Sequence, residues 1–600
     1  MVLGFNGRIT VPASVSEPQR FGFLVIGMFC SLAAGAVYAF SLISDKMDSE
    51  YGFSQNDITT VSTIGLVFGY FTLPFGFIFD YFGPKPIFVI GVVTFGLGAI
   101  LFALTFQDTI GHSVASLSLI NAIVNLGTSM FDMASILSIL SWFPVDRGYL
   151  VAAAKTMTGL ASAVIATVYN TYFSGNHTGY MYFLLGLVVV LGTVGFVYIH
   201  LPPYHMTGYR LKHYTEEDHE VARRVEHLYM TTRAPRWRFI FIFVIVISLL
   251  VVITTQSIVF VFLGEDVSFA QRNPPAIIMI VLYCLLCLAI LPCPWLDKSG
   301  TKSDSSVEPL EESGNGEGVN LPAQQSNDMV ADAQEEKLLS NDDKNFPQYR
   351  TGFFYNLLHN VPLWCLSINA IVLSGGIFTL SFNTRQIFVA ISEDPTEIRI
   401  PNLYVALQSV GSALSRLGVS FFEAWNASRP MEKRIPIIIA YFVPAVSLFL
   451  SSLLFLVVPT KALILPMLFG GFVNGSYAAA LVLTVRTIYS IDVAKHYNLF
   501  FLFDLIGGVV FNRFIFGELM TKKSFIDEDG NVRCFGRKCI QTTFILLTCF
   551  SALAFCATLL MYVSYMRFVR ATRKEKEMAT QKKEEVPEEK SENTEVPTAE

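Results

Sequence analysis

The stretch that decides the fold is Gly76-Phe77-Ile78-Phe79-Asp80-Tyr81-Phe82-Gly83-Pro84-Lys85, because it joins two long apolar runs through a very short charged connection. One run extends from about residue 58 to residue 79, and the next begins directly after Lys85. Gly83 and Pro84 turn the chain, and Gly76 lets helix backbones approach closely. Asp80 can face the positive N-terminus of a neighbouring helix. The stretch therefore predicts two membrane helices joined on the cytoplasmic side, which Lys85 marks.

The composition places the rest of the chain in a membrane as well. Of the 600 residues, 52% are hydrophobic and only 15% are charged, and the mean hydropathy is +0.50. Apolar runs long enough to cross ~30 Å of hydrocarbon recur along the sequence, and each needs about 20 residues as a helix. We therefore expect an all-α, polytopic membrane protein with the lipid bilayer as its partner and no nucleic acid.

The spacing of the apolar runs predicts about fourteen helices with both chain ends in the cytoplasm. We expect them at 21–44, 57–80, 86–106, 114–142, 149–172, 180–201, 239–263, 275–296, 356–384, 401–424, 435–458, 461–486, 497–519 and 540–566. The predicted domains are a cytoplasmic arm (1–20), an N-terminal six-helix bundle (21–201), a basic cytoplasmic loop (202–238), two additional transmembrane helices (239–296), a disordered acidic cytoplasmic loop (297–353), a C-terminal six-helix bundle (354–566) and a disordered cytoplasmic tail (567–600).

Two features belong to the predicted outer side. Asn176 begins the sequon Asn-His-Thr, which can accept a glycan in a short outer loop. The loop 521–539 is basic, against the positive-inside rule, yet the helix parity places it outside. Cys534 and Cys539 in that loop can form a disulfide in an oxidising compartment. A miscounted helix is the competing explanation for the charges.

The first and last six helices echo each other, as in transporters built from parallel repeats. A pair of glycines followed by an acid occurs in both groups, as Gly69, Gly76 and Asp80 in one and Gly411, Gly418 and Glu423 in the other. An offset of 349 positions carries Lys155 onto Asp504 and Asn125 onto Asn474. Two halves related in this way enclose a central cavity and can rock about it.

Several ionisable residues fall inside the predicted helices, where a charge costs ~2.5–3.5 kcal/mol and persists only with a partner or a purpose. Counted from the inner turn at 143–148, Asp132 and Lys155 lie ~15 Å and ~10 Å deep at about 1.5 Å per residue. Their similar depth on adjacent helices would permit contact. The other such residues are Arg416, Asp504 and Arg513.

These charges suggest three roles in transport. Lys155 attracts an anionic substrate or forms a gate that breaks and remakes as the halves rock. Asp132 or Asp504 takes up a proton, because desolvation raises the pKa of a carboxyl group, and so couples transport to a gradient. Arg416 or Arg513 supplies a fixed positive charge for a carboxylate. The alternative is that these charges form structural pairs that hold the helices in register.

Two signatures resemble known transporters. Gly76, Asp80, Gly83 and Lys85 match the G-x-x-x-D-x-x-G-x-[K/R] signature between the second and third helices of the major facilitator superfamily. The segment Trp-Phe-Pro-Val-Asp-Arg-Gly at 142–148, followed by Ala-Lys at 154–155 and Gly-Leu at 159–160, is similar to nodulin-like proteins. They form a branch of that superfamily related to oxalate/formate and monocarboxylate carriers.

The resemblance implies two six-helix bundles with about two extra helices between them. Gly76, Asp80, Gly83, Lys85, Arg147 and Glu423 then form the motif that changes between conformations. The segment around Tyr38 fits the same branch, and the hydroxyl of Tyr38 is expected at the central cavity.

We therefore expect a secondary transporter of a small organic anion such as a monocarboxylate. A metal ion such as iron, bound by Asp132, Asp504 and the histidines between 205 and 227, is the alternative substrate, and a nutrient sensor that transports nothing is a further alternative. The sequence has no G-x-x-x-x-G-K-[S/T] loop, H-E-x-x-H motif or nucleophile elbow, so we expect neither an ATP-driven pump nor an enzyme, and no cofactor. The expected location is the plasma membrane or an endolysosomal or vacuolar membrane.

Overall fold

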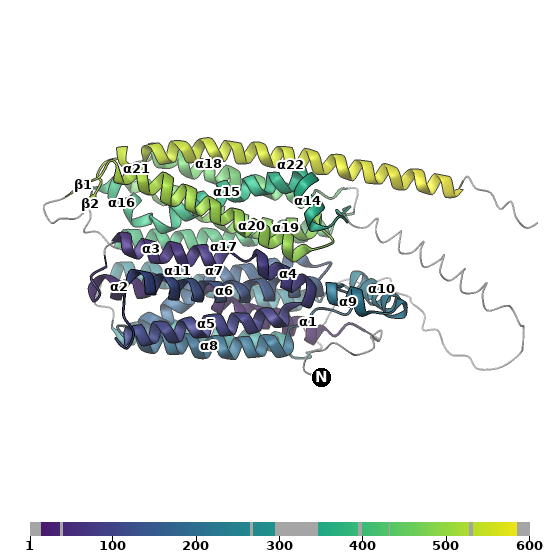
Figure 1. Cartoon of the computed structure of the whole chain (residues 1–600), viewed down its shortest axis with the longest axis horizontal. Helices are drawn as coiled ribbons and strands as arrows, with labels where there is room; N and C mark the ends of the chain where they lie inside the picture. Colours follow the sequence, from purple (N-terminus) through teal and green to yellow (C-terminus); the bar gives the residue numbers. More distant parts are fainter. Residues whose placement is uncertain are drawn as a thin grey trace, which may run out of the picture.

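The computed structural model describes residues 14–36, 40–53, 55–263, 268–293, 346–393, 399–430, 433–526 and 532–584. Within these ranges, twelve helices are long and apolar enough to cross a membrane. Helices α1 (Glu17–Gly35) and α17 (Arg399–Ala427) pack against them and bring the bundle to fourteen. All run nearly parallel to one long axis (Figure 1). The chain is thus an all-α, multi-pass membrane protein, as predicted.

The N-terminal half holds α1 to α8. After α1 come α2 (Ser41–Ser49), α3 (Gln55–Tyr70), α4 (Leu73–Phe82), α5 (Pro84–Phe106), α6 (Val114–Trp142), α7 (Arg147–Tyr172) and α8 (His177–Tyr198). Two short helices follow, α9 (Gly208–His213) and α10 (Glu216–Thr231), and then the two additional spans, α11 (Arg236–Leu263) and α12 (Phe269–Leu285) with its 3₁₀ continuation η2 (Leu286–Ile290).

The C-terminal half begins at residue 353. Its helices are α14 (Phe353–His359), α15 (Val361–Phe382), α16 (Thr384–Ser392), α17, η4 (Ile437–Tyr441), α18 (Phe442–Val457), η5 (Thr460–Ala462), α19 (Ile464–Ile488), α20 (Val493–Gly507), the π-helix η6 (Gly508–Gly517), α21 (Glu518–Thr521) and α22 (Lys538–Glu584). Strands β1 (Phe525–Ile526) and β2 (Val532–Arg533) pair antiparallel as a small hairpin between α21 and α22.

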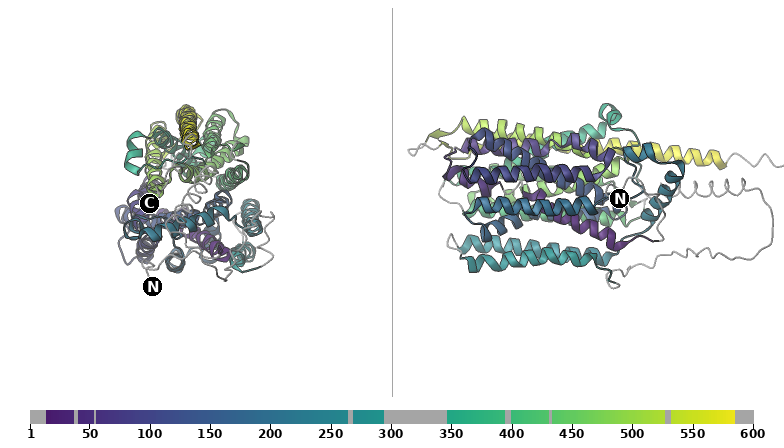
Figure 2. Two further views of the ribbon diagram at one scale, coloured as in Figure 1. Left: turned by 90° about the vertical axis from the view of Figure 1, so that its right-hand side faces the viewer. Right: turned by 60° about the horizontal axis from the view of Figure 1, so that its bottom comes forward.

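The two halves lie side by side, which the end-on view in Figure 2 shows as purple and blue helices below green and yellow ones. In Figure 1, α9, α10 and α14 lie at one end of the bundle, here called the α10 end, and the β1–β2 hairpin lies at the other, the hairpin end. The α10 end is the one predicted to face the cytoplasm.

The additional helices are attached by one buried cation. Arg238, near the start of α11, is fully buried. Its guanidinium donates hydrogen bonds to the main-chain oxygens of Ala289 and, at 3.0 Å, Leu291, which lie where η2 ends. Such carbonyls have no partner within their own helix. Arg238 therefore caps η2 from α11 and fixes the two spans to each other.

Two predicted helix limits are corrected by the structure. The helix predicted at 57–80 is broken into α3 and α4, because Pro74 in the first turn of α4 has no N–H to continue the preceding helix. The tail predicted to be disordered from residue 567 instead continues α22 as far as Glu584. Its lysines, arginines and glutamates have high helix propensity, so a helix that has already formed extends through them.

Candidate functional site

A cavity of about 190 Å³ lies in the middle of the bundle, between the two halves. Helices α1, α3, α6 and α7 form its wall in the N-terminal half, and α15, α17, α19 and α20 form the facing wall. Four of the five charged residues singled out in the sequence line it, namely Asp132, Lys155, Arg416 and Asp504. The fold thus brings charges from four helices to one central space.

Lys155 and Asp132 form an ion pair at the cavity wall. The Lys155 Nζ lies 2.8 Å from Asp132 Oδ2 and 2.9 Å from Oδ1, so the ammonium group donates to both carboxylate oxygens. The side chains are 7% and 18% exposed. The Tyr497 ring, from the other half, lies 5.9 Å from the same Nζ. The charge of Lys155 is thus balanced within its own half, while the facing half adds an aromatic surface.

Arg416 crosses from α17 to the backbone of α7. Its Nη1 donates a hydrogen bond to the main-chain oxygen of Lys155, so the cation of one half is fixed beside the ion pair of the other. A Cβ atom on Gly159, one turn further along α7, would lie only 2.7 Å from that Nη1. Gly159 therefore leaves the space through which the guanidinium reaches α7.

Asp504 is the buried acid of the C-terminal half and is only 2% exposed. The Tyr477 hydroxyl donates to its Oδ1 over 2.6 Å, and the Ser374 hydroxyl donates to its main-chain oxygen over 3.1 Å. Its carboxyl group is therefore hydrogen-bonded to a neutral phenol rather than paired with a cation. Lys155 and Asp504 occupy positions that the 349-residue offset relates, and both line the cavity.

Sequence reasoning missed the uncharged part of the wall. Tyr477, Tyr497 and Phe501 line the cavity, and Tyr70 meets Phe378 and Phe501 across the halves, with ring centroids 5.4 and 5.7 Å apart. A signal was present for α19, because the same offset carries the α6 cavity residues onto α19 cavity residues. The matched pairs are Asn125 with Asn474, Thr128 with Tyr477, Ser129 with Ala478 and Asp132 with Leu481.

The two halves are joined at the α10 end by Asp80. Its carboxylate accepts hydrogen bonds from the main-chain N–H groups of Ala494 at 3.2 Å and Lys495 at 3.0 Å, in the first turn of α20. A Cβ atom on Gly76 would lie 3.0 Å from the Ala494 oxygen, so glycine is what allows α4 to approach α20. Gly83, which ends α4, has a φ of 86°, which only glycine adopts readily.

Arg147 joins the halves at the same end. Its Nη1 donates to the main-chain oxygen of Arg486 over 3.5 Å, and its charge is attracted to that of Glu423 on α17. A Cβ atom on Gly148 would lie 2.6 Å from the nitrogen of Ala424, so α7 and α17 meet backbone to backbone. Lys85, which also belongs to the predicted motif, has its Nζ 5.9 Å from the Phe196 ring of its own half.

Three predicted residues lie away from the cavity or outside the described ranges. Arg513 belongs to η6, where its half-exposed side chain pairs with Glu518 at 3.7 Å. Tyr38 lies outside the described residues. Asn176 is exposed and caps α8 by accepting a hydrogen bond from the Gly179 N–H over 2.8 Å.

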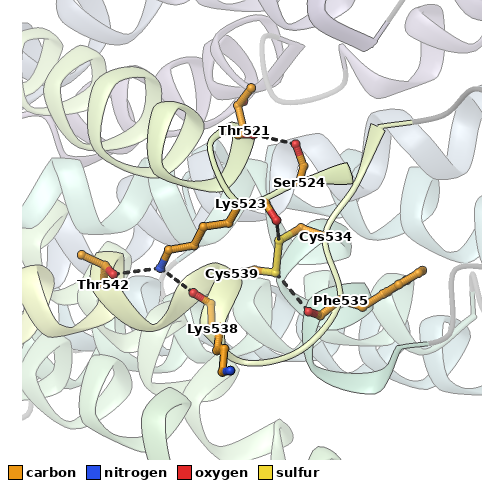
Figure 3. The surroundings of a disulfide bond; sticks show 8 residues. All are labelled: Thr521, Lys523, Ser524, Cys534, Phe535, Lys538, Cys539 and Thr542. Atoms are coloured by element: carbon orange, nitrogen blue, oxygen red, sulfur yellow. Dashed lines mark hydrogen bonds between the residues drawn. A yellow bond between two sulfur atoms is a disulfide. The ribbon is translucent and has the colours of Figure 1, made fainter. Parts of the chain in front are cut away.

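At the hairpin end, a disulfide joins Cys534 to Cys539 (Figure 3). The neighbouring cations are held by main-chain oxygens. Lys523 Nζ donates to the Lys538 oxygen at 2.6 Å, and Arg537 donates to the Leu456 oxygen at 3.0 Å near the end of α18. Lys523 and Arg537 thus have local structural partners, which explains these two basic residues independently of the membrane topology.

The histidines between 205 and 227 do not form a metal site. His205 is directed at the Ser141 hydroxyl, 3.4 Å from its Nδ1, and burial lowers the pKa of His205 to about 3. His213 stacks on Tyr209. Within the described residues, no three His, Cys, Asp or Glu side chains come together in a way that could hold a metal ion.

Comparison with known proteins agrees with this architecture. The sequence profile of the Major Facilitator Superfamily matches residues 24–213. "Probable transporter MCH1" of Debaryomyces hansenii is 20% identical over 196 residues, which cover 31% of this chain and 40% of that protein. The protein of the same name from Wickerhamomyces anomalus is 24% identical over 174 residues, covering 27% and 35%. The chain thus matches less than half the length of either relative.

Among solved structures, the "MFS (major facilitator superfamily) proton:xylose symporter XylE bound to 6-bromo-6-deoxy-D-glucose" has a TM-score of 0.53. It is 12% identical in sequence, and the alignment covers 91% of this chain and 96% of that one. At this identity the likeness concerns the fold alone. The chain therefore has the major facilitator superfamily fold.

Proposed function

We propose that this protein is a secondary transporter that moves a small organic anion, such as a monocarboxylate, by alternating access. The observation that carries the proposal is the central cavity, where Lys155 and Arg416 meet between the two halves. Cations inside a membrane are costly and are retained where they serve a substrate or a pathway. The resemblance to nodulin-like proteins, relatives of monocarboxylate carriers, supports the same substrate class.

The arrangement of charges explains how an anion would be accepted. Lys155 is already neutralised by Asp132, so a substrate carboxylate must compete with Asp132 for the ammonium group or bind beside it. Arg416 lies next to this pair and offers a planar fork that suits a carboxylate. A cavity of about 190 Å³ limits the substrate to a small solute.

Asp504 is our candidate for proton coupling. Its neighbours are the hydroxyls of Tyr477 and Ser374 rather than a cation. Desolvation without a counter-charge favours the neutral form of a carboxyl group. A proton bound there removes one negative charge from the cavity, so that an anion enters more easily.

The alternation would take place at the α10 end. The hydrogen bonds from the start of α20 to Asp80, and from Arg147 to the Arg486 oxygen, join the halves there and must break for that end to open. Each joins a charged side chain to main-chain groups, and water that enters as this end opens can take the place of the main-chain partner.

The test is transport in proteoliposomes that contain the purified full chain. We expect radiolabelled lactate to exchange across the membrane. We also expect it to accumulate inside the vesicles when the outside is more acidic than the inside. The double variant Lys155→Met with Asp132→Leu removes both charges together and should abolish exchange. Arg513→Gln, which removes an exposed cation outside the cavity, is the matched control and should exchange normally.

The other outcomes distinguish the alternatives. Uptake of radiolabelled iron with no movement of lactate would favour a metal transporter. The arrangement of Asp132 speaks against it, because this carboxylate is bound to Lys155. Saturable binding of a solute without any counterflow would instead favour a sensor with a transporter fold.

A further inference from the structure

A second, shallow pocket of about 20 Å³ lies at the α10 end where α7, α11 and α17 meet. We call it the arginine pocket; its lining includes Asp146, Arg233, Arg236, Ala427 and Ser428, together with Val145, Tyr149 and Ala424. Asp146 precedes the first residue of α7, Arg236 is the first residue of α11, and Ala427 is the last residue of α17. One wall thus belongs to the N-terminal half and its additional helix, and the other to the C-terminal half.

The arginine pocket carries an excess of positive charge. Arg233 and Arg236 are exposed, and Asp146 is the carboxylate whose charge acts on both. One oxygen of that carboxylate already accepts the Ala234 N–H at 2.8 Å. Arg434, in the loop after α17, lies close enough to Arg233 for the two cations to repel each other. Two guanidinium groups, of Arg233 and Arg236, therefore line the pocket with one carboxylate that is partly occupied. Arg434 lies beside Arg233, and its own charge is partly balanced by Glu423.

The helix ends add to the positive charge of the arginine pocket. The first residues of α7 and α11 both lie at the pocket, and the N-terminus of a helix carries a partial positive charge of about +0.5. On the opposite wall, the end of α17 carries the contrary charge, but Arg434 Nη2 donates to the Ala427 oxygen over 2.7 Å and offsets it. The site is thus suited to an anion of more than one negative charge.

Exposed aromatic side chains place the pocket at the level of lipid headgroups. Trp425 is 52% exposed, with the Arg429 guanidinium 4.5 Å from its ring, and Trp237 is 43% exposed. Exposed tryptophans of this kind mark the interface between membrane and water. Further into the bilayer, α11 presents an exposed apolar stripe that consists of Ile240, Val244, Ile247 and Val251. A phosphate at the arginines therefore has acyl-chain surface directly beside it.

We propose that the arginine pocket binds the phosphate group of an anionic membrane lipid, whose acyl chains lie along α11. Basic pockets between helices near the membrane surface are a recurring way to hold such headgroups. Because the pocket includes residues from both halves, the bound lipid holds α7, α11 and α17 together and stabilises the state that is closed at the α10 end. This inference does not depend on which solute the central cavity takes.

The test measures lipid binding to the detergent-purified full chain by native mass spectrometry, with phosphatidic acid as the probe and phosphatidylcholine as the neutral lipid. The variant Arg233→Gln with Arg236→Gln should bind phosphatidic acid about tenfold more weakly, which is 1.4 kcal/mol. Arg223→Gln with Arg224→Gln is the matched control, since it removes the same charge from exposed positions of α10. We expect the control to bind like the unchanged protein.

A second measurement guards against misfolding. Phosphatidic acid should raise the melting temperature of the unchanged protein and of the control, but not that of the pocket variant. Arg236→Lys keeps the charge while losing the planar fork, so it should fold normally and lose only part of the affinity.

Three results would overturn the proposal. Equal weakening in the pocket variant and the control would mean that binding follows net charge alone. Unchanged binding in the pocket variant would place the lipid elsewhere. Inorganic phosphate that competes at the concentration of phosphatidic acid itself would indicate a site for a soluble ion, because the acyl chains would then contribute nothing.

Discussion

The Lys155–Asp132 pair of the central cavity and the hydrogen bonds of Asp80 and Arg147 at the α10 end hold charge in different ways. In the cavity, Lys155 is bound by the carboxylate of Asp132, so one side chain neutralises another. At the α10 end, Asp80 is held by main-chain N–H groups of α20, and Arg147 by a main-chain oxygen. A side-chain pair can exchange partners with a charged solute, whereas a contact with the backbone depends on the position of a whole helix. The first arrangement suits binding, and the second suits a switch between two positions.

The largest effect should come from breaking the cavity pair on one side. Lys155→Ala leaves the Asp132 carboxylate buried without its cation, and losing one member of a buried pair costs about 3–5 kcal/mol. We expect a large fall in melting temperature together with loss of transport. Adding Asp132→Leu should restore much of the stability but none of the transport. Equal stability of the single and double variants would show that the pair is not coupled.

The next largest effect concerns the coupling of transport to the proton gradient rather than the stability of the protein. Asp504→Asn keeps an oxygen that can accept the Tyr477 hydroxyl but removes the titrating group. We expect accumulation driven by a pH gradient to disappear while one-for-one exchange continues, measured in the same proteoliposomes. Tyr477→Phe, which keeps the carboxyl group, should retain accumulation. Normal accumulation in Asp504→Asn would move the proton site elsewhere.

A smaller effect, on stability at low pH, is expected from His205 at the α10 end. Burial lowers the pKa of His205 to about 3 from the usual 6.5, and the cations Arg486 and Arg210 act in the same direction. As the pH falls, His205 is protonated in the unfolded chain before it is protonated in the folded protein. The contribution of neutral His205 to the free energy of unfolding is therefore fully present above pH 6.5 and is lost as the pH drops towards 3. At pH 5 the loss is about 2 kcal/mol at most. His205→Asn should flatten the pH dependence of the melting temperature, and an unchanged slope would exclude His205 as its source.

The smallest effect should follow from Asp80→Asn. The substitution keeps an acceptor for the start of α20 but removes the negative charge that the helix dipole favours, worth about 0.3–1 kcal/mol. We expect the α10 end to open more often, which would appear as faster labelling of a cysteine placed at Ser141. Glu518→Gln at the hairpin end is a control of equal charge and should leave that labelling rate unchanged.

Much of the site could be predicted because charge inside a membrane is conspicuous. The similar depth of Asp132 and Lys155 on adjacent helices permits the contact that the structure shows, and the repeat offset relates Asp504 to Lys155. The cavity aromatics were missed, since a tyrosine or phenylalanine in a membrane helix looks like its many lipid-facing neighbours. Arg513 belongs to the π-helix η6, which changes the helical register after Asp504, and its half-exposed side chain pairs with Glu518. The arginine pocket is not predicted by the sequence, because its residues come from three segments, at 145–149, 233–236 and 424–428, that are far apart along the chain.

Helix α22 has a consequence for whatever engages the end of the chain. It is 47 residues long, and a crossing of the hydrocarbon uses only about 20 of them. At about 1.5 Å per residue, the part of the helix after residue 566 extends ~27 Å further as a stiff rod. Figure 1 shows it extending well beyond the other helices. A binding protein or a modifying enzyme that acts near Glu584 would therefore be held at a fixed distance from the membrane surface.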